Sequence, residues 1–362
     1  MNIFLRPDAL SVLTNKKARA SLARYFYVMQ DEKAAKFLIA RKLPAEFARE
    51  DTTEDLWKQH AALTEKFYDL ESEIDVRIKN LQEMANPERS YLDLKIEIAR
   101  RILAKCHFCT RRCGANRHNT VGYCKCGDKM AVSSIFEHFG EEPELVPSGT
   151  IFTMGCTMRC LHCQNWTISQ WIEDGKAYDT DTLADEVERL RLSGCRNANL
   201  VGGDPTPWLT QWLETFRHVR KNIPIVWNSN SYYSPETARL LSGFADVYLL
   251  DFKYGPEDCA SKISDAPTYW EVCTYNHLEA KKHGELIVRL LILPNHLECC
   301  TEPIVRWIAS NLGSEVRVNI MFQYRPKWRA HEVPELRRRL TKNEMERTIQ
   351  LAKEAHLTNY IT

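Results

Sequence analysis

The sequence predicts a mixed α/β protein whose carboxyl-terminal part forms a partial (β/α)6 barrel of the TIM type. From residue 149 onward, short apolar runs alternate with stretches of helical periodicity, which indicates crossover connections in a parallel sheet. Before residue 105, the periodicity is helical throughout. We therefore expect a helical amino-terminal extension over 1–104, a small cysteine-rich metal-binding segment over 105–148 and the barrel over 149–362.

Length, charge and cysteine content narrow the class of protein. The chain has 362 residues, enough for two or three units at about 100–200 residues each. Lys and Arg number 49 against 48 Asp and Glu, so no global charge favours nucleic acid or an anionic membrane. No run approaches the ~20 apolar residues of a membrane span. The 13 cysteines are clustered and the start shows no secretory signal, which predicts reduced, metal-binding thiols in the cytoplasm.

The strongest helical pattern before residue 105 begins near Leu56 and predicts an amphipathic helix with a narrow apolar seam. Apolar residues recur there at three-, four- and seven-residue steps: Leu56, Leu63, Phe67, Leu70, Ile74, Ile78, Leu81 and Met84. An earlier helix around 19–43 is the expected partner, in a helical hairpin or docked on the barrel; a dimer seam is the alternative. We expect a structural role, because the stretch carries no cysteine.

Four cysteines at metal-binding spacing follow the helical region: Cys106, Cys109, Cys113 and Cys124. Four thiolates complete either a zinc site or a fully coordinated iron–sulfur cluster, and the spacing does not decide between the two. Cys126 is a spare thiol that could substitute for Cys124. The alternative is a group of reduced structural thiols.

Six strands and six helices are predicted for the barrel. The strands are placed at 150–154, 198–202, 224–227, 247–251, 286–293 and 316–322. The helices are placed near 183–192, 208–221, 235–241, 270–282, 302–310 and 342–354. In such a barrel the chemistry lies at the carboxyl ends of the strands.

A loop with three cysteines follows the first predicted strand on that face. Cys156, Cys160 and Cys163 are separated by three and two residues and can reach one inorganic centre. A [4Fe-4S] cluster usually takes four thiolates, so three leave one iron open to another ligand. The alternative is a zinc loop, but zinc sites usually combine two separated cysteine pairs.

This loop resembles the signature of the radical S-adenosylmethionine (SAM) superfamily. The resemblance implies that the open iron binds the amino and carboxylate groups of SAM. It also implies that the reduced cluster splits the S–C5′ bond and that the resulting 5′-deoxyadenosyl radical takes hydrogen from a substrate. His162 falls where the family often has an aromatic residue near the adenine. Gly202-Gly203-Asp204 resembles the family's GGE motif, which contacts the SAM amino group.

Further candidates lie at the ends of later strands. Asp251 and Lys253 look like the DxK motif of glycyl-radical-enzyme activases, which helps to seat SAM. A buried charge needs a partner, so Arg289 is expected to point into the barrel at a carboxylate. The candidate SAM-binding residues are His162, Gly202, Gly203, Asp204, Asn228, Asn230, Asp251, Lys253, Arg289 and Gln323.

Over about residues 105–360 the motifs together look like the PflX-type branch, which is related to pyruvate formate-lyase activating enzyme. Glu141-Glu142-Pro143 is part of this likeness, and Gln323 stands near the position of an activase histidine. The branch implies hydrogen removal from a protein glycine, with electrons from a flavodoxin- or ferredoxin-type reductase. Modification of another protein, a peptide or a small-molecule metabolite is the alternative. A non-catalytic zinc- or nucleic-acid-binding protein is a remote one, because no basic, aromatic-interleaved surface is evident.

Overall fold

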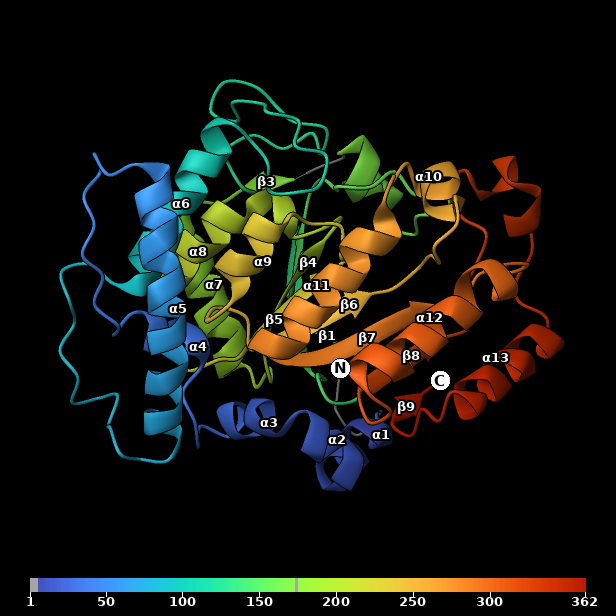
Figure 1. The fold of residues 1–362 in the computed structure, drawn as a ribbon, viewed down its shortest axis with the longest axis horizontal. Coiled ribbons are helices and arrows are strands. Elements are labelled where there is room, and N and C mark those ends of the chain that lie inside the picture. The colour runs from blue at the N-terminus through green and yellow to red at the C-terminus, as the bar shows by residue number, and fades with distance from the viewer. Residues whose placement is uncertain (1–5, 173–174) are drawn as a thin grey trace.

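The computed structural model describes residues 6–172 and 175–362 and is organised around one nine-stranded sheet (Figure 1). The strand order is β3-β1-β2-β4-β5-β6-β7-β8-β9. The strands are β1 Ala131–His138, β2 Ser148–Thr153, β3 Lys176–Ala177, β4 Ala198–Gly202, β5 Ile225–Ser229, β6 Val247–Asp251, β7 Glu285–Leu291, β8 Arg317–Met321 and β9 Tyr360–Ile361. The predicted absence of a secretory signal rests on the first residues, of which 1–5 lie outside the described part.

The predicted partial barrel is confirmed. β2 and β4 to β8 are parallel neighbours, and they coincide with the six predicted strands. The helices of the barrel are α7 Thr180–Leu192, α8 Leu209–His218, α9 Pro235–Leu241, α10 Cys259–Ser264, α11 Tyr269–His283, α12 Glu302–Trp307 and α13 Lys342–Glu354. Shorter helical segments are η2 Val12–Thr14, η3 Thr167–Trp171, η4 Thr206–Trp208, η5 Leu297–Thr301, η6 Ile308–Leu312, η7 Ala330–Glu332 and η8 Pro334–Leu336. Only α10 among the seven α-helices of the barrel was not predicted.

The amino-terminal helices run along one side of the sheet and below it (Figure 1). They are α1 Pro7–Ser11, α2 Lys16–Ser21, α3 Ala23–Met29, α4 Lys36–Ala40, α5 Thr53–Asp75 and α6 Tyr91–Ala104. The expected helix over 19–43 is therefore three short helices. α5 packs against α4 and α6, and Lys95 of α6 donates a hydrogen bond to the Leu240 carbonyl of α9 at 3.1 Å. The extension is thus docked on the barrel.

The prediction that the α5 seam continues to Met84 is wrong, because the helix ends at Asp75. Arg77 adopts a left-handed conformation (φ 62°), and its N–H and that of Ile78 bond to the carbonyls of Ile74 and Glu73. This pattern is a Schellman cap, which satisfies the last carbonyls of a helix. Ile78 is consequently 72% exposed. Glycine usually occupies this left-handed position, and an arginine there gave no sequence signal.

The floor of the barrel is closed by the loop between β1 and β2. Glu142 lies 3.0 Å from Arg289 of β7, and Glu144 lies 2.5 Å from Arg317 of β8. Asn319 of β8 also donates a hydrogen bond to Glu142 at 2.7 Å. Glu142, Glu144 and Arg317 are buried and Arg289 is largely so, and each buried charge depends on its partner for compensation. No helix within residues 6–172 and 175–362 combines the length and the apolar character that crossing a bilayer requires.

Glu285, at the start of β7, caps a helix of the amino-terminal extension. Its carboxylate accepts hydrogen bonds from the backbone N–H groups of Arg24 (2.7 Å) and Tyr25 (2.6 Å) in the first turn of α3. The residue that precedes α3 makes no side-chain cap, so Glu285 supplies the missing acceptor. Burial raises the pKa of Glu285 to about 7.

We expect Glu285→Gln to remove part of the pH dependence of stability. The pKa of Glu285 is raised in the folded state, so the folded protein binds this proton more tightly than the unfolded chain. The free energy of unfolding therefore falls as the pH rises from about 4.5 to about 7. Over that window the wild type should lose about 3 kcal/mol relative to the variant. Urea unfolding at both pH values measures the free energies of unfolding, and Glu54→Gln, at an exposed position, is the control. An equal change with pH in the wild type and Glu285→Gln would contradict the raised pKa of Glu285.

Candidate active site

The three-cysteine loop is held over the carboxyl end of β2 by backbone hydrogen bonds. Gly155 donates to the Ile168 carbonyl at 2.8 Å and accepts from the N–H of Asp204 at 3.0 Å. Gly203 in turn donates to the Thr153 carbonyl at 2.9 Å. The loop after β2 and the loop after β4 are therefore joined main chain to main chain, on the face where barrel chemistry lies.

The environment of the thiols in this loop suits a metal centre, whose positive charge would stabilise the thiolate form. Cys156 accepts N–H hydrogen bonds from Met158 and Asn230, both at 3.4 Å, and Cys163 lies 3.2 Å from the Ser169 hydroxyl. Burial, with a smaller contribution from the neighbouring Cys163, raises the pKa of Cys160 to about 11. Free thiols here stay protonated, whereas iron would stabilise the thiolates. N–H donors to the sulfurs and mutual proximity fit an iron–sulfur cluster.

Gly202 and Gly203 allow the two loops to approach closely. Gly202 has a φ of 142°, and a Cβ at Gly203 would lie 2.0 Å from the Gly155 carbonyl oxygen. A side chain at either position is excluded by backbone rather than by a movable side chain.

Asp204 is buried and bonded to protein groups. One carboxylate oxygen accepts from the Thr206 N–H, and the other accepts from the Ser229 hydroxyl and the Asn230 N–H, all at 2.9 Å. Asn230 then donates to Cys156, so Asp204 orients a residue that touches the three-cysteine loop. The predicted contact of Asp204 with SAM stays a prediction.

Lys253, Asp251 and His162 lie around the same loop. Lys253 forms an ion pair with Asp251, and its charge lowers the pKa of both Cys160 and Cys163, although burial of these thiols outweighs that effect. His162 accepts or donates a 2.8 Å hydrogen bond with the Tyr254 hydroxyl. Burial lowers the pKa of His162 to about 3, so the ring is neutral. The structure thus gathers an acidic, a basic and a neutral aromatic group beside the thiols.

Three other candidates lie on β5, on β7 and just after β8. Arg289 is the register partner of Asp251 on the neighbouring strand, pairs with Glu142 and donates to the side-chain oxygen of Asn228 at 3.2 Å. The side-chain nitrogen of Asn228 is buried without a partner among the described residues. Gln323 follows the end of β8 and is exposed. The roles of these three residues in SAM binding stay predictions.

The second cysteine group also comes together. A Cβ on Gly122 would lie 3.1 Å from the Cys113 sulfur and 3.7 Å from the Cys124 sulfur. Burial raises the pKa of Cys109 to about 12, with added repulsion from the three other thiols of the group, Cys106, Cys113 and Cys124. A hydrogen bond from Cys126 lowers the pKa of Cys124 to about 6. The donor set fits either zinc or an iron–sulfur cluster.

This cysteine-rich segment is fastened to the three-cysteine loop by two arginines. Arg111 donates to the Thr157 carbonyl at 2.8 Å, and Arg159 bonds to the Tyr123 carbonyl. Both guanidinium groups also lie over the Tyr123 ring, at 3.4 and 4.2 Å from its centroid. The two cysteine groups therefore form neighbouring parts of one surface.

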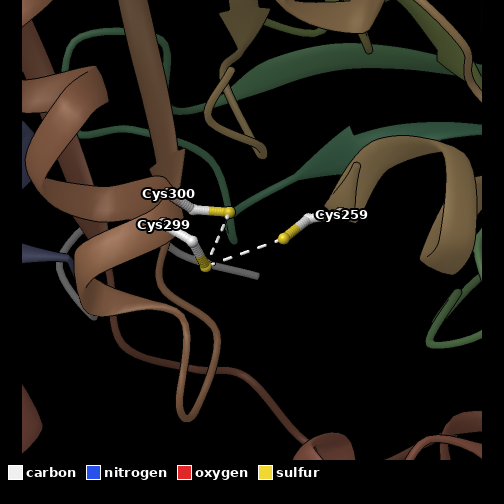
Figure 2. Close-up of side chains that lie close together, drawn as sticks. All are labelled: Cys259, Cys299 and Cys300. Atoms are coloured by element: carbon white, nitrogen blue, oxygen red, sulfur yellow. Dashed lines mark hydrogen bonds between the residues drawn. The ribbon is translucent and has the colours of Figure 1, made fainter. Parts of the chain in front are cut away.

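Two features of this face were missed by sequence reasoning. Trp166 stacks on Trp328 with centroids 4.3 Å apart, and Trp171 meets both edge-on. A third cysteine group, Cys259, Cys299 and Cys300, gathers between the loops after β6 and β7 (Figure 2). The adjacent cysteines at 299 and 300 are the one sequence signal for it, but Cys259 lies 40 positions away.

Comparison with known proteins gives a family match and relatives. Residues 150–308 match the family described as the radical SAM superfamily. The uncharacterized protein MJ0674 of Methanocaldococcus jannaschii is 41% identical over 342 residues, covering 93% of this chain and 98% of that protein. A second protein of that organism, MJ0808, is 29% identical over 255 residues, covering 64% and 73%.

Solved structures give more distant likenesses. Streptococcus suis SuiB bound to precursor peptide SuiA is similar with a TM-score of 0.43 and 10% identity, over 57% of this chain and 46% of that one. The radical SAM methyltransferase TsrM of Kitasatospora setae is similar with a TM-score of 0.36 and 17% identity, over 48% of this chain and 36% of that one.

Proposed function

We propose that this chain, which carries a radical SAM superfamily domain over residues 150–308, is an enzyme that removes a hydrogen atom from a protein or peptide. The observation that carries this proposal is the aromatic cluster of Trp166, Trp171 and Trp328 beside the three-cysteine loop. Trp171 is 53% exposed, and the N–H of Arg329 bonds to the Leu161 carbonyl at 2.9 Å, which joins the segment after β8 to the loop. Exposed aromatic clusters are typical of surfaces that bind polypeptide.

Each group of residues in the site would have its own role in binding the cluster and SAM. Cys156, Cys160 and Cys163 would hold the [4Fe-4S] cluster. When bound, the cluster and SAM supply one-electron cleavage of the S–C5′ bond and the abstraction of a hydrogen atom. The Lys253–Asp251 pair offers opposite charges for the carboxylate and amino groups of an amino acid. The buried, neutral His162 offers an aromatic face without a charge.

Within this reaction class we propose a protein glycine as the hydrogen donor, as in activases of glycyl-radical enzymes. The Lys253–Asp251 ion pair beside the thiols, which resembles the DxK motif of these activases, supports this. The second cysteine group, which Arg111 and Arg159 join to the active loop, would serve as an electron relay or a docking module beyond a minimal activase. A flavodoxin- or ferredoxin-type reductase would supply the electron. A small-molecule metabolite is the alternative substrate, and the small residues and polar groups at the strand ends would accommodate it.

Deuterium transfer distinguishes these substrates. Reconstituted enzyme, SAM and reductant are mixed with deuterated cell extract that has been separated into macromolecular and small-molecule fractions. We expect deuterium in 5′-deoxyadenosine from the macromolecular fraction. Label only from the small-molecule fraction would reject a protein or peptide substrate.

A matched pair of variants tests the aromatic cluster. Trp171→Ala should lower transfer from the macromolecular fraction about tenfold or more, as expected for an interface anchor, while slow 5′-deoxyadenosine formation without substrate continues. Leu192→Ala, at a position 72% exposed on α7, is the control and should transfer deuterium like the wild type. Equal transfer by both variants would remove the tryptophans from the substrate surface.

Asp204→Ala should weaken SAM binding and leave the cluster in place. The variant releases the backbone and side chain of the segment Ser229–Asn230, which Asp204 holds through two hydrogen bonds. A loss of 10–100-fold in affinity is expected, in the range of outer-shell substitutions at metal sites. Equilibrium dialysis with SAM, with iron per chain measured in parallel, gives the result; unchanged affinity would exclude Asp204 from the site.

A further inference from the structure

Cys259, Cys299 and Cys300 form a cysteine triad that neither SAM nor the two predicted metal sites uses. Figure 2 shows their sulfurs pointing toward one another from two chain segments, α10 on one side and η5 on the other. The Cys259 and Cys299 sulfurs are 3.6 Å apart, and those of Cys299 and Cys300 are 3.7 Å apart. In the part of the chain that the structure describes, this is the one group with three metal-ligand atoms within 4.8 Å of one another.

These spacings match thiolates on one metal ion rather than the ligands of a [4Fe-4S] cluster. With zinc–sulfur bonds of about 2.3 Å and tetrahedral angles, two thiolates on the same zinc lie about 3.8 Å apart. In a [4Fe-4S] cluster each thiolate binds a different iron, so the ligand sulfurs lie farther apart. A disulfide is also excluded in this state, because its sulfurs lie about 2.05 Å apart. We propose that Cys259, Cys299 and Cys300 bind a single zinc ion.

The three thiolates leave one position of the tetrahedron open. His296 precedes η5 and is buried, but its ring nitrogens are not part of the group of ligand atoms that lie within 4.8 Å of one another. A water molecule would therefore take the fourth position, as in zinc sites with three protein ligands.

The ion would tie together two loops of the active face. Cys259 begins α10, after the segment that carries Lys253 and Tyr254, and Cys299 belongs to the loop that follows β7. These loops already touch, since a Cβ on Gly255 would lie 2.0 Å from the Cys299 carbonyl oxygen. The same segment contacts the three-cysteine loop, where Leu161 donates to the Ile263 carbonyl at 2.9 Å. Zinc here would fix the segment that positions Tyr254 against His162.

Metal analysis tests the site without any activity assay. Wild type, Cys259→Ser and Cys299→Ser are purified anaerobically, treated with chelator, reloaded with zinc chloride and analysed for zinc and iron per chain. Cys195→Ser is the control, because Cys195 is buried outside all three cysteine groups. We expect the wild type and the control to hold one more zinc per chain than either triad variant. Equal zinc in all four proteins, or a loss of iron in place of zinc, would overturn the proposal.

A measurement on the unaltered protein covers the case in which a variant fails to fold. Cys259 is partly exposed, so iodoacetamide should modify it at least tenfold more slowly in zinc-loaded than in chelator-treated wild type. Peptide mass spectrometry gives this ratio and detects any disulfide. Equal modification rates, or a disulfide within the triad in reduced protein, would contradict zinc binding. The outcome is independent of the proposed reaction, because a protein that transfers no deuterium can still bind this ion.

Discussion

Cys160→Ala should lose the formation of 5′-deoxyadenosine from SAM. Three thiolates hold the cluster, and a loop with two of them cannot keep the site-differentiated arrangement that leaves one iron open. Substitutions outside the ligand set of metal sites already cost 10–100-fold, so removal of a ligand should cost more than about 100-fold. Reconstituted protein, reductant and SAM are incubated anaerobically, and 5′-deoxyadenosine is quantified together with iron per chain. The same outcome is expected for Cys156→Ala and Cys163→Ala.

Cys195→Ala is the matched control for this loss. Cys195 is fully buried, as Cys156 nearly is, but its sulfur lies 3.8 Å from the Ser193 hydroxyl, away from every cysteine group. The control should keep iron and activity, because it removes a buried thiol of equal size without removing a ligand. Near wild-type turnover by Cys160→Ala would refute the assignment of the loop and reopen the zinc alternative.

Gly203→Ala should disrupt both the fold and the cluster site. The added Cβ would lie 2.0 Å from the Gly155 carbonyl oxygen and 3.0 Å from the Ser169 Cα, and both neighbours are backbone. The two loops must separate, which breaks the hydrogen bond from the Asp204 N–H to Gly155. Overpacking of this kind costs about 1–3 kcal/mol and occasionally more. The free energy of unfolding of the metal-free protein, measured with urea, and the iron content per chain after reconstitution should both fall.

Gly127→Ala separates this effect from a general sensitivity to glycine replacement. The nearest atom to its added Cβ would be the Arg117 carbonyl oxygen at 3.8 Å, which is an ordinary contact. Stability within about 0.5 kcal/mol of wild type is expected, as for a substitution without a steric conflict. If Gly203→Ala matches this control in stability and iron content, the close approach of the two loops is not needed for the site.

The barrel could be predicted from sequence because each of its strands is a short apolar run between amphipathic helices. The helix over 235–241 was predicted to the residue, since Ser234 caps it and Pro235 begins it. The antiparallel strand β1 was missed because its burial alternates irregularly, with Phe136 41% exposed. The end of α5 was missed because Arg77 takes a conformation that usually marks glycine.

The candidate site could be predicted only where its residues are close in sequence. The three-cysteine loop and the Gly202–Asp204 motif are local patterns, so their chemistry is visible in the chain. The triad joins Cys259 to Cys299, and the tryptophan cluster joins Trp166 to Trp328; these pairs meet only because the carboxyl ends of parallel strands share one edge. A carboxylate partner for Arg289 could be expected from sequence, but Glu142 could not be identified as that partner, because it comes from the loop before β2.

The helical extension and the barrel are not separable modules in thermodynamic terms. Without the extension, Glu285 would lose the N–H groups of α3 that it caps, and the Leu240 carbonyl would lose Lys95. Asp246 would likewise lose Arg24, 3.3 Å away, and would remain as an unpaired carboxylate at the start of β6. Each buried polar group that loses its partner carries an unfavourable desolvation free energy. The chain should therefore unfold in one cooperative transition, because the first hundred residues supply the partners of buried polar groups on the strands that present the active face.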